Sequence, residues 1–566
     1  MLRKRQKTVY IQIAAAVLVV CTAIYQMKHI SGMTIYPDEF GYWANAAQWL
    51  GYDWSGTAAL QSYYSFGYSM VLLPLLAMIK NPLLLYKTAV MLNVIFVYLH
   101  AVILFQAACE FSKDIKPQWF CALMAACYPS LLFYMQFTMT ESLLNLLFML
   151  SIWLLLKFEK TGKVHYCIFM VCVLGYMFFV HMRTIGILTA GVLIGIISLI
   201  RLKKNIVYKL AYLAGIFIFL AALILMGNMV KELLQSNLYV SADKNILGIN
   251  DFSGQLVKVR YLLTADGIKK LAVSSIGKLF YLGLATCGTF YFGVWGLLKR
   301  TWSGNVYRYI ALSAAFTFFI SALYTMDGGR ADTLLYGRYN EIIIPIIVYL
   351  GLCEMLEHKK IFRSICIILV MQGMMAYVLL RVMSEVNPAG FQGYFVIGIS
   401  YALQEIMPII SDYVLYPYFA GSVAMCLLAL VLGLFIRRKQ LLEWYLCIFI
   451  GLYLYTALSA GNKYIYDHSL DIAQDMDMMQ QVNESLESED IVSFLLSDND
   501  AHYIDILQFC LREKVLEVLM EDEINVDELK ADYVFTYHNS IQEEALKEKY
   551  GREMETFHFK LYYDGT

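Results

Sequence analysis

Two adjacent carboxylates follow the first long apolar segment of this 566-residue chain, within Tyr36-Pro37-Asp38-Glu39-Phe40-Gly41-Tyr42-Trp43. A carboxylate that is partly withdrawn from water can act as a general base toward an acceptor hydroxyl. Asp38 can also cap the start of a helix over 39–50, because its oxygen can accept unpaired N–H groups of the first turn. The two roles are compatible, so the sequence predicts a base here without excluding a cap.

A third carboxylate, Glu141, lies in Thr138-Met139-Thr140-Glu141-Ser142. Thr140 followed by Glu141 is a typical helix start, which is the simpler explanation. The span assignment given below, however, places Glu141 on the same membrane face as Asp38. We therefore predict Asp38, Glu39 and Glu141 as the catalytic carboxylates.

Three arginines complete the candidate site. Arg183 ends an apolar segment, and Arg330 and Arg338 flank Asp332. The positive-inside rule places most cations in the cytoplasm, so arginines on the outer face indicate an anionic partner. The planar guanidinium matches a phosphate group. The alternative is an ion pair with a neighbouring carboxylate or contact with a lipid headgroup.

The composition is that of a membrane protein joined to a soluble acidic part. Hydrophobic residues make up 60% and charged residues 16%, against about 45–50% and about 25% in soluble domains. Residues 461–566 hold 25 of the 45 acidic and 8 of the 44 basic residues, which leaves 20 acidic and 36 basic in 1–460. We divide the chain there into a membrane module, 1–460, and a soluble domain, 461–566.

Thirteen segments are apolar and about long enough to cross a bilayer as helices. They are 8–27, 85–108, 118–138, 142–157, 166–181, 185–200, 206–229, 274–298, 307–325, 340–356, 363–381, 419–436 and 441–460. Clusters of Lys and Arg recur at the N-terminus and after every second span, which predicts a cytoplasmic N-terminus and an external C-terminus. We expect the first span to be an uncleaved anchor.

The first outer loop, 28–84, carries two shorter apolar helices. We expect the helix over 39–50 at the membrane interface, and the one over 66–80 as an interfacial or re-entrant helix. Counting 66–80 as a span would place most basic clusters outside. Tyr and Trp crowd this loop, and such rings favour the headgroup level.

The soluble part alternates predicted helices with predicted strands, which indicates a small α/β domain. The expected strands are 491–496, 514–519, 532–537 and 556–563, and the expected helices are 470–488, 502–512 and 541–549. The predicted fold class is thus an all-α polytopic membrane protein with a small C-terminal extracytoplasmic α/β domain.

The chemistry is constrained further by what the sequence lacks. It has no P-loop, GxSxG or HExxH motif, and its twelve cysteines form no C-x-x-C spacing. The sequence therefore favours neither a nucleotide-driven pump, nor a familiar hydrolase, nor a zinc site or disulfide framework. Nucleic acid is not expected as a partner, whereas membrane lipids are.

These motifs resemble those of the glycosyltransferase C-fold superfamily, in particular the protein O-mannosyltransferases and the lipid A aminoarabinose transferases. Pro37-Asp38-Glu39-x-x-Tyr42 matches the acidic motif of their first loop. Tyr63-Tyr64-Ser65-Phe66-Gly67-Tyr68 resembles their next block, and Tyr336-Gly337-Arg338-Tyr339 a late outer segment. Thr140-Glu141 matches the position of their second acidic residue.

The resemblance implies transfer of one sugar from a polyprenyl-phosphate carrier to an extracytoplasmic acceptor, with inversion. Asp38 would then be the base, and Glu141 would position the acceptor or hold a metal. The aminoarabinose transferases carry a lysine before the second interfacial helix, but 61–68 has no cation here. Arg183, Arg330 and Arg338 are thus the candidates for the donor phosphate.

The remaining predicted substrate contacts are His181, Tyr42, Tyr64, Tyr336 and Tyr339. Some relatives use a divalent metal, Mg or Mn, and others do not, so the resemblance leaves a metal cofactor open. The sugar and the acceptor, whether protein, wall polymer or glycolipid, are open as well. The sequence as a whole favours a location in a bacterial cell membrane.

The main alternative is a transporter or a flippase for lipid-linked sugars, in which the outer charges would gate a polar headgroup. The sequence shows no repeated halves, which many transporters have. A non-catalytic scaffold is a third alternative, but it does not explain the acids of the first loop.

Overall fold

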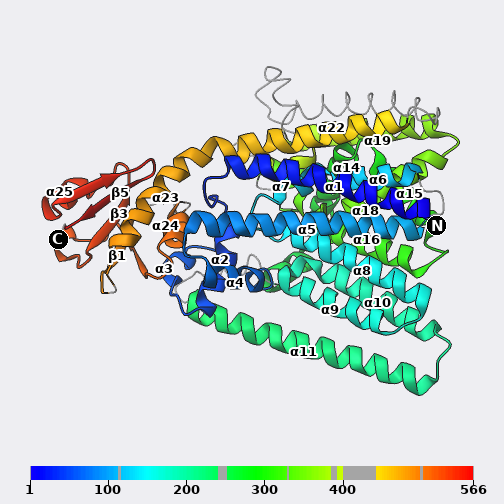
Figure 1. The fold of residues 1–566 in the computed structure, drawn as a ribbon, viewed down its shortest axis with the longest axis horizontal. Coiled ribbons are helices and arrows are strands. Elements are labelled where there is room, and N and C mark those ends of the chain that lie inside the picture. The colour runs from blue at the N-terminus through cyan, green and yellow to red at the C-terminus, as the bar shows by residue number, and fades with distance from the viewer. Residues whose placement is uncertain are drawn as a thin grey trace.

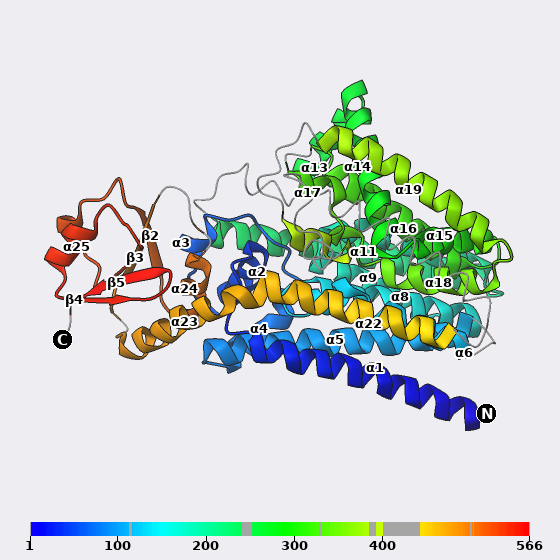
Figure 2. The same cartoon turned by 90° about the horizontal axis from the view of Figure 1, so that it is seen from above.

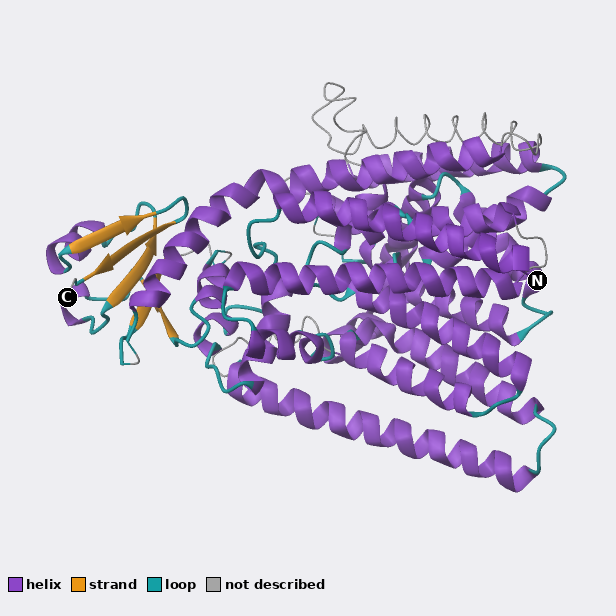
Figure 3. Ribbon diagram, viewed as in Figure 1, coloured by secondary structure: helices purple, strands orange, loops and turns teal. Residues whose placement is uncertain are grey.

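The computed structural model describes residues 2–111, 116–239, 252–327, 330–383, 392–399, 442–487, 489–497, 501 and 503–564. Long helices form a bundle, and a small sheet domain stands at one end of it (Figure 1, Figure 3). The N-terminus lies at the opposite end of the bundle. The predicted span 419–436 lies outside the described residues. The predicted fold class, a helical membrane module with a small C-terminal α/β domain, is confirmed.

Most helices of the bundle overlap predicted spans. The helices of the bundle are α1 (Leu2–His29), α5 (Pro82–Phe111), α6 (Lys116–Ala126), α7 (Pro129–Tyr134), α8 (Glu141–Thr161), α9 (His165–Val180), α10 (Ile185–Arg201), α11 (Ile206–Leu238), α13 (Phe252–Tyr261), α14 (Ala265–Ala285), α15 (Thr289–Arg300), α16 (Asn305–Tyr324), α17 (Ala331–Leu335), α18 (Ile344–Glu357), α19 (Ile361–Met383) and α22 (Leu442–Gly461). Of these, α13 and α17 lie in segments predicted as outer loops. Among the described residues, six helices are long and apolar enough to span a membrane, or eight if bent pairs count as one span. The total of thirteen remains a prediction.

Two of the predicted spans are broken helices. The prediction of one helix over 274–298 is wrong, because α14 and α15 meet at 105°. Cys287 and Gly288 at the break have φ angles of 48° and 78°, which no helix residue adopts. The predicted span 118–138 is divided before Pro129, since a residue that precedes proline is driven out of the helical region, as Tyr128 is with ψ of 132°.

The first loop folds into the bundle instead of lying on its surface. It contains α2 (Pro37–Trp49), α3 (Ser55–Ala58) and α4 (Ser69–Met78). Several aromatic rings of this loop are buried inside the protein. Four rings are at most 1% exposed, those of Tyr42, Trp43, Trp54 and Tyr68. They are covered because α2 packs on α4, α11 and the C-terminal domain.

The C-terminal part combines α23 (Asp467–Ser485), α24 (Ile504–Cys510) and α25 (Glu543–Lys549) with a five-stranded sheet of order β2-β1-β3-β5-β4. The strands are β1 (Val492–Leu496), β2 (Leu516–Met520), β3 (Tyr533–Tyr537), β4 (Arg552–Glu555) and β5 (Phe559–Tyr563). β1 pairs in parallel with β2 and β3, and β5 pairs antiparallel with β3 and β4. The strand predicted over 556–563 corresponds to β5 but begins three residues too early, because residues 556–558 form the turn after β4. β4 itself was not predicted. β4 is charged, as edge strands often are, and so lacks an apolar pattern.

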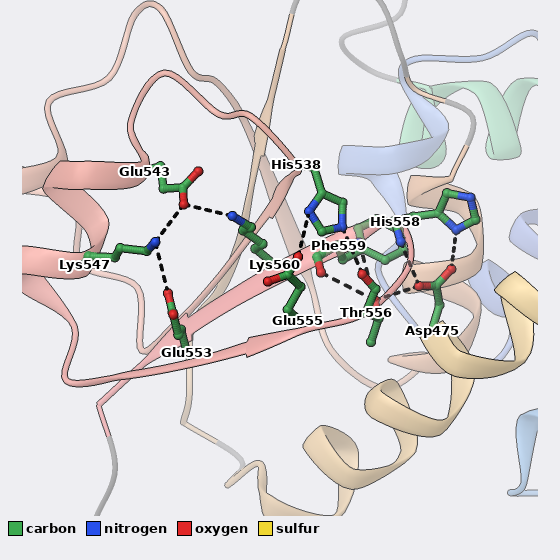
Figure 4. Close-up of polar contacts among 10 residues, drawn as sticks. All are labelled: Asp475, His538, Glu543, Lys547, Glu553, Glu555, Thr556, His558, Phe559 and Lys560. Atoms are coloured by element: carbon green, nitrogen blue, oxygen red, sulfur yellow. Dashed lines mark hydrogen bonds and ion pairs between the residues drawn. The ribbon is translucent and has the colours of Figure 1, made fainter.

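The turn between β4 and β5 is attached to α23 by one buried carboxylate (Figure 4). Asp475 accepts hydrogen bonds from the Thr556 hydroxyl at 2.7 Å and from the His558 backbone N–H at 3.2 Å. Its second oxygen lies 2.5 Å from His558 Nδ1. These contacts fix the sheet relative to the helix that leaves the bundle.

The C-terminal domain also holds the first loop directly. Trp54 donates its indole N–H to the carbonyl of Arg512 at 2.8 Å. The Arg512 guanidinium donates in turn to the carbonyls of Leu76 and Ile79, at 3.0 and 2.6 Å, which end α4. The domain thereby braces two segments of the first loop, both of which follow the helix α2 that carries Asp38 and Glu39.

Asp505 of α24 adds a buried hydrogen bond to the same loop. Gln61 donates to one of its oxygens at 2.5 Å, and the other oxygen is buried without a partner among the described residues. Burial raises the pKa of Asp505 well above its usual range. Asp505 is therefore protonated over a wider pH range in the folded protein than in the unfolded chain, where its pKa is about 3.9. The stability contributed by the neutral carboxyl is complete below that value. It is lost as the pH rises through the pKa of the folded protein.

We therefore expect Asp505→Asn to raise the free energy of unfolding by about 1 kcal/mol or more when it is measured above neutral pH. The reason is that the variant leaves no buried charge at this position. The gain should shrink as the pH falls. Thermal unfolding in detergent at several pH values measures this. Asp522→Asn, at an exposed position of the same domain, is the control, and a gain that is equal at all pH values would contradict the assignment.

Candidate active site

Arg338 connects two of the predicted carboxylates at the end of the bundle next to the C-terminal domain. Its Nη1 lies 2.6 Å from Asp38 Oδ2, and its Nε lies 2.6 Å from Glu141 Oε1. The Arg338 side chain is 4% exposed, whereas that of Asp38 is 28% exposed. Arg338 therefore holds Asp38 in place while leaving it accessible.

The local sequence explains this placement of Asp38. Pro37 occupies the first turn of α2 and has no N–H to leave unpaired. The N-cap position is Tyr36, and no side chain caps the helix. The capping role considered for Asp38 is thus wrong, because the carboxylate turns to Arg338 instead. An acid in the first turn is still favoured by the helix dipole.

Arg183 approaches Glu141 from the short helix Met182–Thr184 that follows α9. Its Nη2 donates to Glu141 Oε1 at 3.1 Å, and its guanidinium stacks 4.7 Å from the Tyr339 ring centre. The Nε and Nη1 of Arg183 are buried and have no hydrogen-bond partner among the described residues. Buried N–H groups without partners are rare in proteins. They mark a place where an anion could accept two charged hydrogen bonds.

Tyrosines line the same site from the first loop. The Tyr64 hydroxyl hydrogen-bonds the Asp38 carboxylate, and burial together with that carboxylate raises the pKa of Tyr64 well above its usual value. Tyr64 also contacts Tyr42 edge-on, with ring centres 5.6 Å apart. Both predicted contacts therefore lie beside Asp38, where Tyr64 stays neutral and can act as a donor.

Glu39 has a different environment from Asp38. Neighbouring residues of a helix point about 100° apart, so Glu39 turns into the core, where it is 0% exposed. One oxygen accepts from the Thr138 N–H at 2.6 Å, the Thr138 hydroxyl at 2.7 Å and the Tyr86 hydroxyl at 2.9 Å. The other accepts from the N–H and the hydroxyl of Thr34. Burial raises the pKa of Glu39, and these hydrogen bonds oppose the shift.

We expect Glu39→Gln to lower stability by about 1–3 kcal/mol, because an amide offers one acceptor oxygen where the carboxylate serves five donors. Denaturation midpoints in detergent measure the loss. Glu232→Gln, at an exposed carboxylate of α11, should change nothing. A stable Glu39→Gln protein that has lost all activity would instead restore the predicted catalytic role.

The other predicted contacts gather around the segment that carries Arg338. Tyr336 and Tyr339 meet with ring centres 5.0 Å apart, and His181 lies 6.1 Å from the Tyr339 ring. Arg330 is separate: its Nε and Nη2 both bond Asp332, at 3.1 Å each. The ion pair weighed as the alternative for Arg330 is the one observed.

Sequence reasoning missed the residues of α14 that fix this segment. Lys278 is buried and donates to the carbonyls of Thr333 and Leu334, at 2.5 and 3.2 Å. A Cβ at Gly337 would overlap the Tyr281 ring, so glycine permits the close approach. Lys278 fell inside a predicted span, and an ionisable residue there is itself a functional signal.

A largely apolar cavity of about 500 Å³ lies beside the site. It is lined by α9, α10 and α11 and by residues 63, 65 and 66 of the first loop. Met182 and Ile185, which bracket Arg183, are among its walls, and Lys231 of α11 is the cation that lines it. The chain on both sides of Arg183 thus borders this cavity.

The residues of this site do not fit a divalent metal. Asp38 and Glu141 both face Arg338. Within the described part of the chain, no group of three or more His, Cys, Asp or Glu side chains is placed to hold an ion.

No protein-family model and no curated protein matches this sequence. Among solved structures, the chain is similar to ArnT from Cupriavidus metallidurans in the apo state, with a TM-score of 0.51, 13% identity and 97% of both chains covered. It is also similar to ArnT from the same organism bound to undecaprenyl phosphate, with a TM-score of 0.50, 12% identity and 97% of both chains covered. The similarity at this identity concerns the fold, which is the one expected from the resemblance, and the helices make the chain a multi-pass membrane protein.

Proposed function

We propose that this protein is a membrane glycosyltransferase that moves one sugar from a polyprenyl-phosphate carrier to a hydroxyl group of an extracytoplasmic acceptor. The proposal rests above all on Arg183, which pairs with Glu141, keeps two N–H groups unpaired among the described residues, and follows Met182 of the apolar cavity wall. A phosphate joined to a long hydrocarbon chain needs both features in one place. A protein of this fold, ArnT, binds undecaprenyl phosphate.

The carrier would lie with its hydrocarbon chain in the cavity and its phosphate at Arg183. The cavity walls are mostly apolar, and α11 leaves much of its surface facing outward, which supports entry of a lipid from the side. Lys231 would add a second positive charge at the phosphate. Lys231 and Arg183 would then take the place of the lysine that residues 61–68 lack. Arg330 is not needed, since its Nε and Nη2 are already paired with Asp332.

Asp38 would take the proton of the acceptor hydroxyl. The hydroxyl oxygen then forms a bond to the anomeric carbon on the side opposite the phosphate, so the configuration inverts. The bond between that carbon and the phosphate oxygen breaks, and its electron pair stays on the leaving polyprenyl phosphate. Donors placed in advance at developing negative charge lower the barrier, which is the role of Arg183. Arg338 would hold Asp38 in position, and Glu141 would orient both arginines.

The positive-inside rule supports an external position for this site. The N-terminus and the loops after α10, α15 and α18 carry the basic clusters, and they lie at the end of the bundle away from the C-terminal domain. The site lies at the other end. The acceptor would therefore be a component of the cell envelope, and a bacterial membrane would supply the carrier.

The test is transfer of label by the purified full-length protein in lipid vesicles. A panel of radiolabelled polyprenyl-phosphate sugars is offered with membrane extract as the source of acceptor. We expect label in the acceptor together with release of polyprenyl phosphate. Movement of intact donor across the bilayer without release would instead favour the transporter alternative.

A further inference from the structure

A second cavity, of about 810 Å³, lies at the end of the bundle opposite the proposed active site. It is formed by the end of α15, the end of α18 and the start of α19. Figure 2 shows these helices together on the side away from the C-terminal domain. The first cavity shares no residue with it.

Positive charge predominates in this second cavity. Five cationic side chains line it, from Lys299, Arg300, Lys359, Lys360 and Arg363, against the two carboxylates of Glu354 and Glu357. The excess is three positive charges by that count. Such an excess around one hollow attracts an anion.

The two carboxylates are already engaged on one wall. Arg300 lies 3.2 Å from Glu354 and 3.4 Å from Glu357, and Lys299 also pairs with Glu354. Arg300 Nη1 is nevertheless buried without a hydrogen-bond partner among the described residues. On the opposite wall, Lys360 and Arg363 are exposed. Within the described residues, neither of these two forms an ion pair.

The rim of the cavity is apolar on the side that faces outward. Trp295 and Ile367 line the cavity, and each is 51% exposed. Phe362, next to Arg363 in the chain, is 49% exposed. On a membrane-spanning bundle such exposed rings and chains lie against lipid. A ligand here therefore meets cations at one end and lipid-facing apolar groups at the other.

We propose that this cavity binds the phosphodiester headgroup of an anionic membrane phospholipid, with Arg300, Lys360 and Arg363 around the phosphate. Basic hollows between membrane helices recognise such headgroups through charge, while the acyl chains stay in the bilayer. A soluble phosphate would gain nothing from the apolar rim, so the lipid is the occupant that matches both parts of the site.

The test uses the full-length protein in phosphatidylcholine vesicles and the fluorescence of Trp295. The Trp295 signal is the fluorescence of the protein minus the fluorescence of its Trp295→Phe variant. Phosphatidylglycerol with brominated acyl chains quenches the signal when it occupies the cavity, and brominated phosphatidylcholine is the neutral comparison. Three backgrounds are compared: the natural sequence, Lys360→Gln/Arg363→Gln, and Lys203→Gln/Lys204→Gln, whose lysines are exposed in the loop after α10, at the same end of the bundle but outside the cavity.

We expect the preference for phosphatidylglycerol to fall roughly 30-fold in Lys360→Gln/Arg363→Gln, since each charge near an anionic lipid contributes roughly five-fold in affinity. The Lys203→Gln/Lys204→Gln protein should keep the preference of the natural sequence. An equal loss in both double variants, or equal quenching by the two lipids, would overturn the proposal. Displacement of the brominated lipid by millimolar inorganic phosphate would overturn the choice of a lipid as the ligand.

Discussion

Asp38→Asn should abolish most sugar transfer, with kcat lower by about 10²–10⁴-fold, the usual contribution of general base catalysis. An amide at this position keeps the shape of the side chain but cannot take the proton of the acceptor hydroxyl. Arg338 would still be paired with Glu141 at 2.6 Å, so the fold should persist. Label transfer from a polyprenyl-phosphate sugar measures the rate, and donor binding should be nearly unchanged.

Asp53→Asn is the matched control for this variant. Asp53 belongs to the same loop and only accepts a hydrogen bond from the Ser55 N–H at 3.0 Å. Its replacement should leave transfer near the natural rate. If Asp38→Asn transferred sugar as fast as the natural protein, the base would have to be another group, and the proposed mechanism would fail.

Arg183→Gln should lower kcat by about 10²–10³-fold, the loss typical for one preorganised donor at a developing negative charge. Arg183 offers two unpaired N–H groups, and the leaving phosphate gains charge as its bond to the sugar breaks. Glutamine can replace neither the charge nor the paired donors. Binding of free polyprenyl phosphate should weaken as well, which equilibrium binding in detergent measures separately from turnover.

Arg330→Gln is the control variant for Arg183→Gln. Arg330 is an arginine of the same end of the bundle, but its Nε and Nη2 are paired with Asp332. We expect a small effect on both phosphate binding and turnover. Equal losses in the two variants would mean that overall charge matters and not the position of Arg183.

The membrane helices could be predicted because each signal is local. About twenty apolar residues are required to cross a bilayer, and runs such as those of α5 and α11 have no other explanation. The bend between α14 and α15 could not be predicted in the same way. The apolar run continues through Cys287 and Gly288, so the hydropathy pattern shows no interruption where the backbone turns left-handed.

The site shows the same division between local and distant information. The acids of the first loop stand out because carboxylates are costly near lipid. Their separate environments could not be read from the sequence, because the partners are remote. Glu39 bonds Thr138, which lies 99 residues away, and Glu141 bonds Arg338, which lies 197 residues away.

The support given to the site by other parts of the chain was missed for a related reason. Lys278 was overlooked within a predicted span, although a lysine there needs carbonyl partners and so indicates a nearby chain segment. Lys231 lay just beyond the predicted end of its helix at residue 229, whereas α11 continues to Leu238. The contact of the C-terminal domain with the first loop joins residues more than 400 positions apart, such as Gln61 and Asp505. No local sequence pattern predicts such a contact.

The most direct test of the central claim is an electron cryo-microscopy structure of the full-length protein with polyprenyl phosphate bound. The account predicts the phosphate within hydrogen-bond distance of Arg183 Nε and Nη1, and the isoprenoid chain in the cavity between α9, α10 and α11. Asp38 should remain paired with Arg338 and face the phosphate across the space that the sugar would fill. A phosphate bound elsewhere, with the donors of Arg183 still empty, would contradict the assignment of this site as the place of transfer.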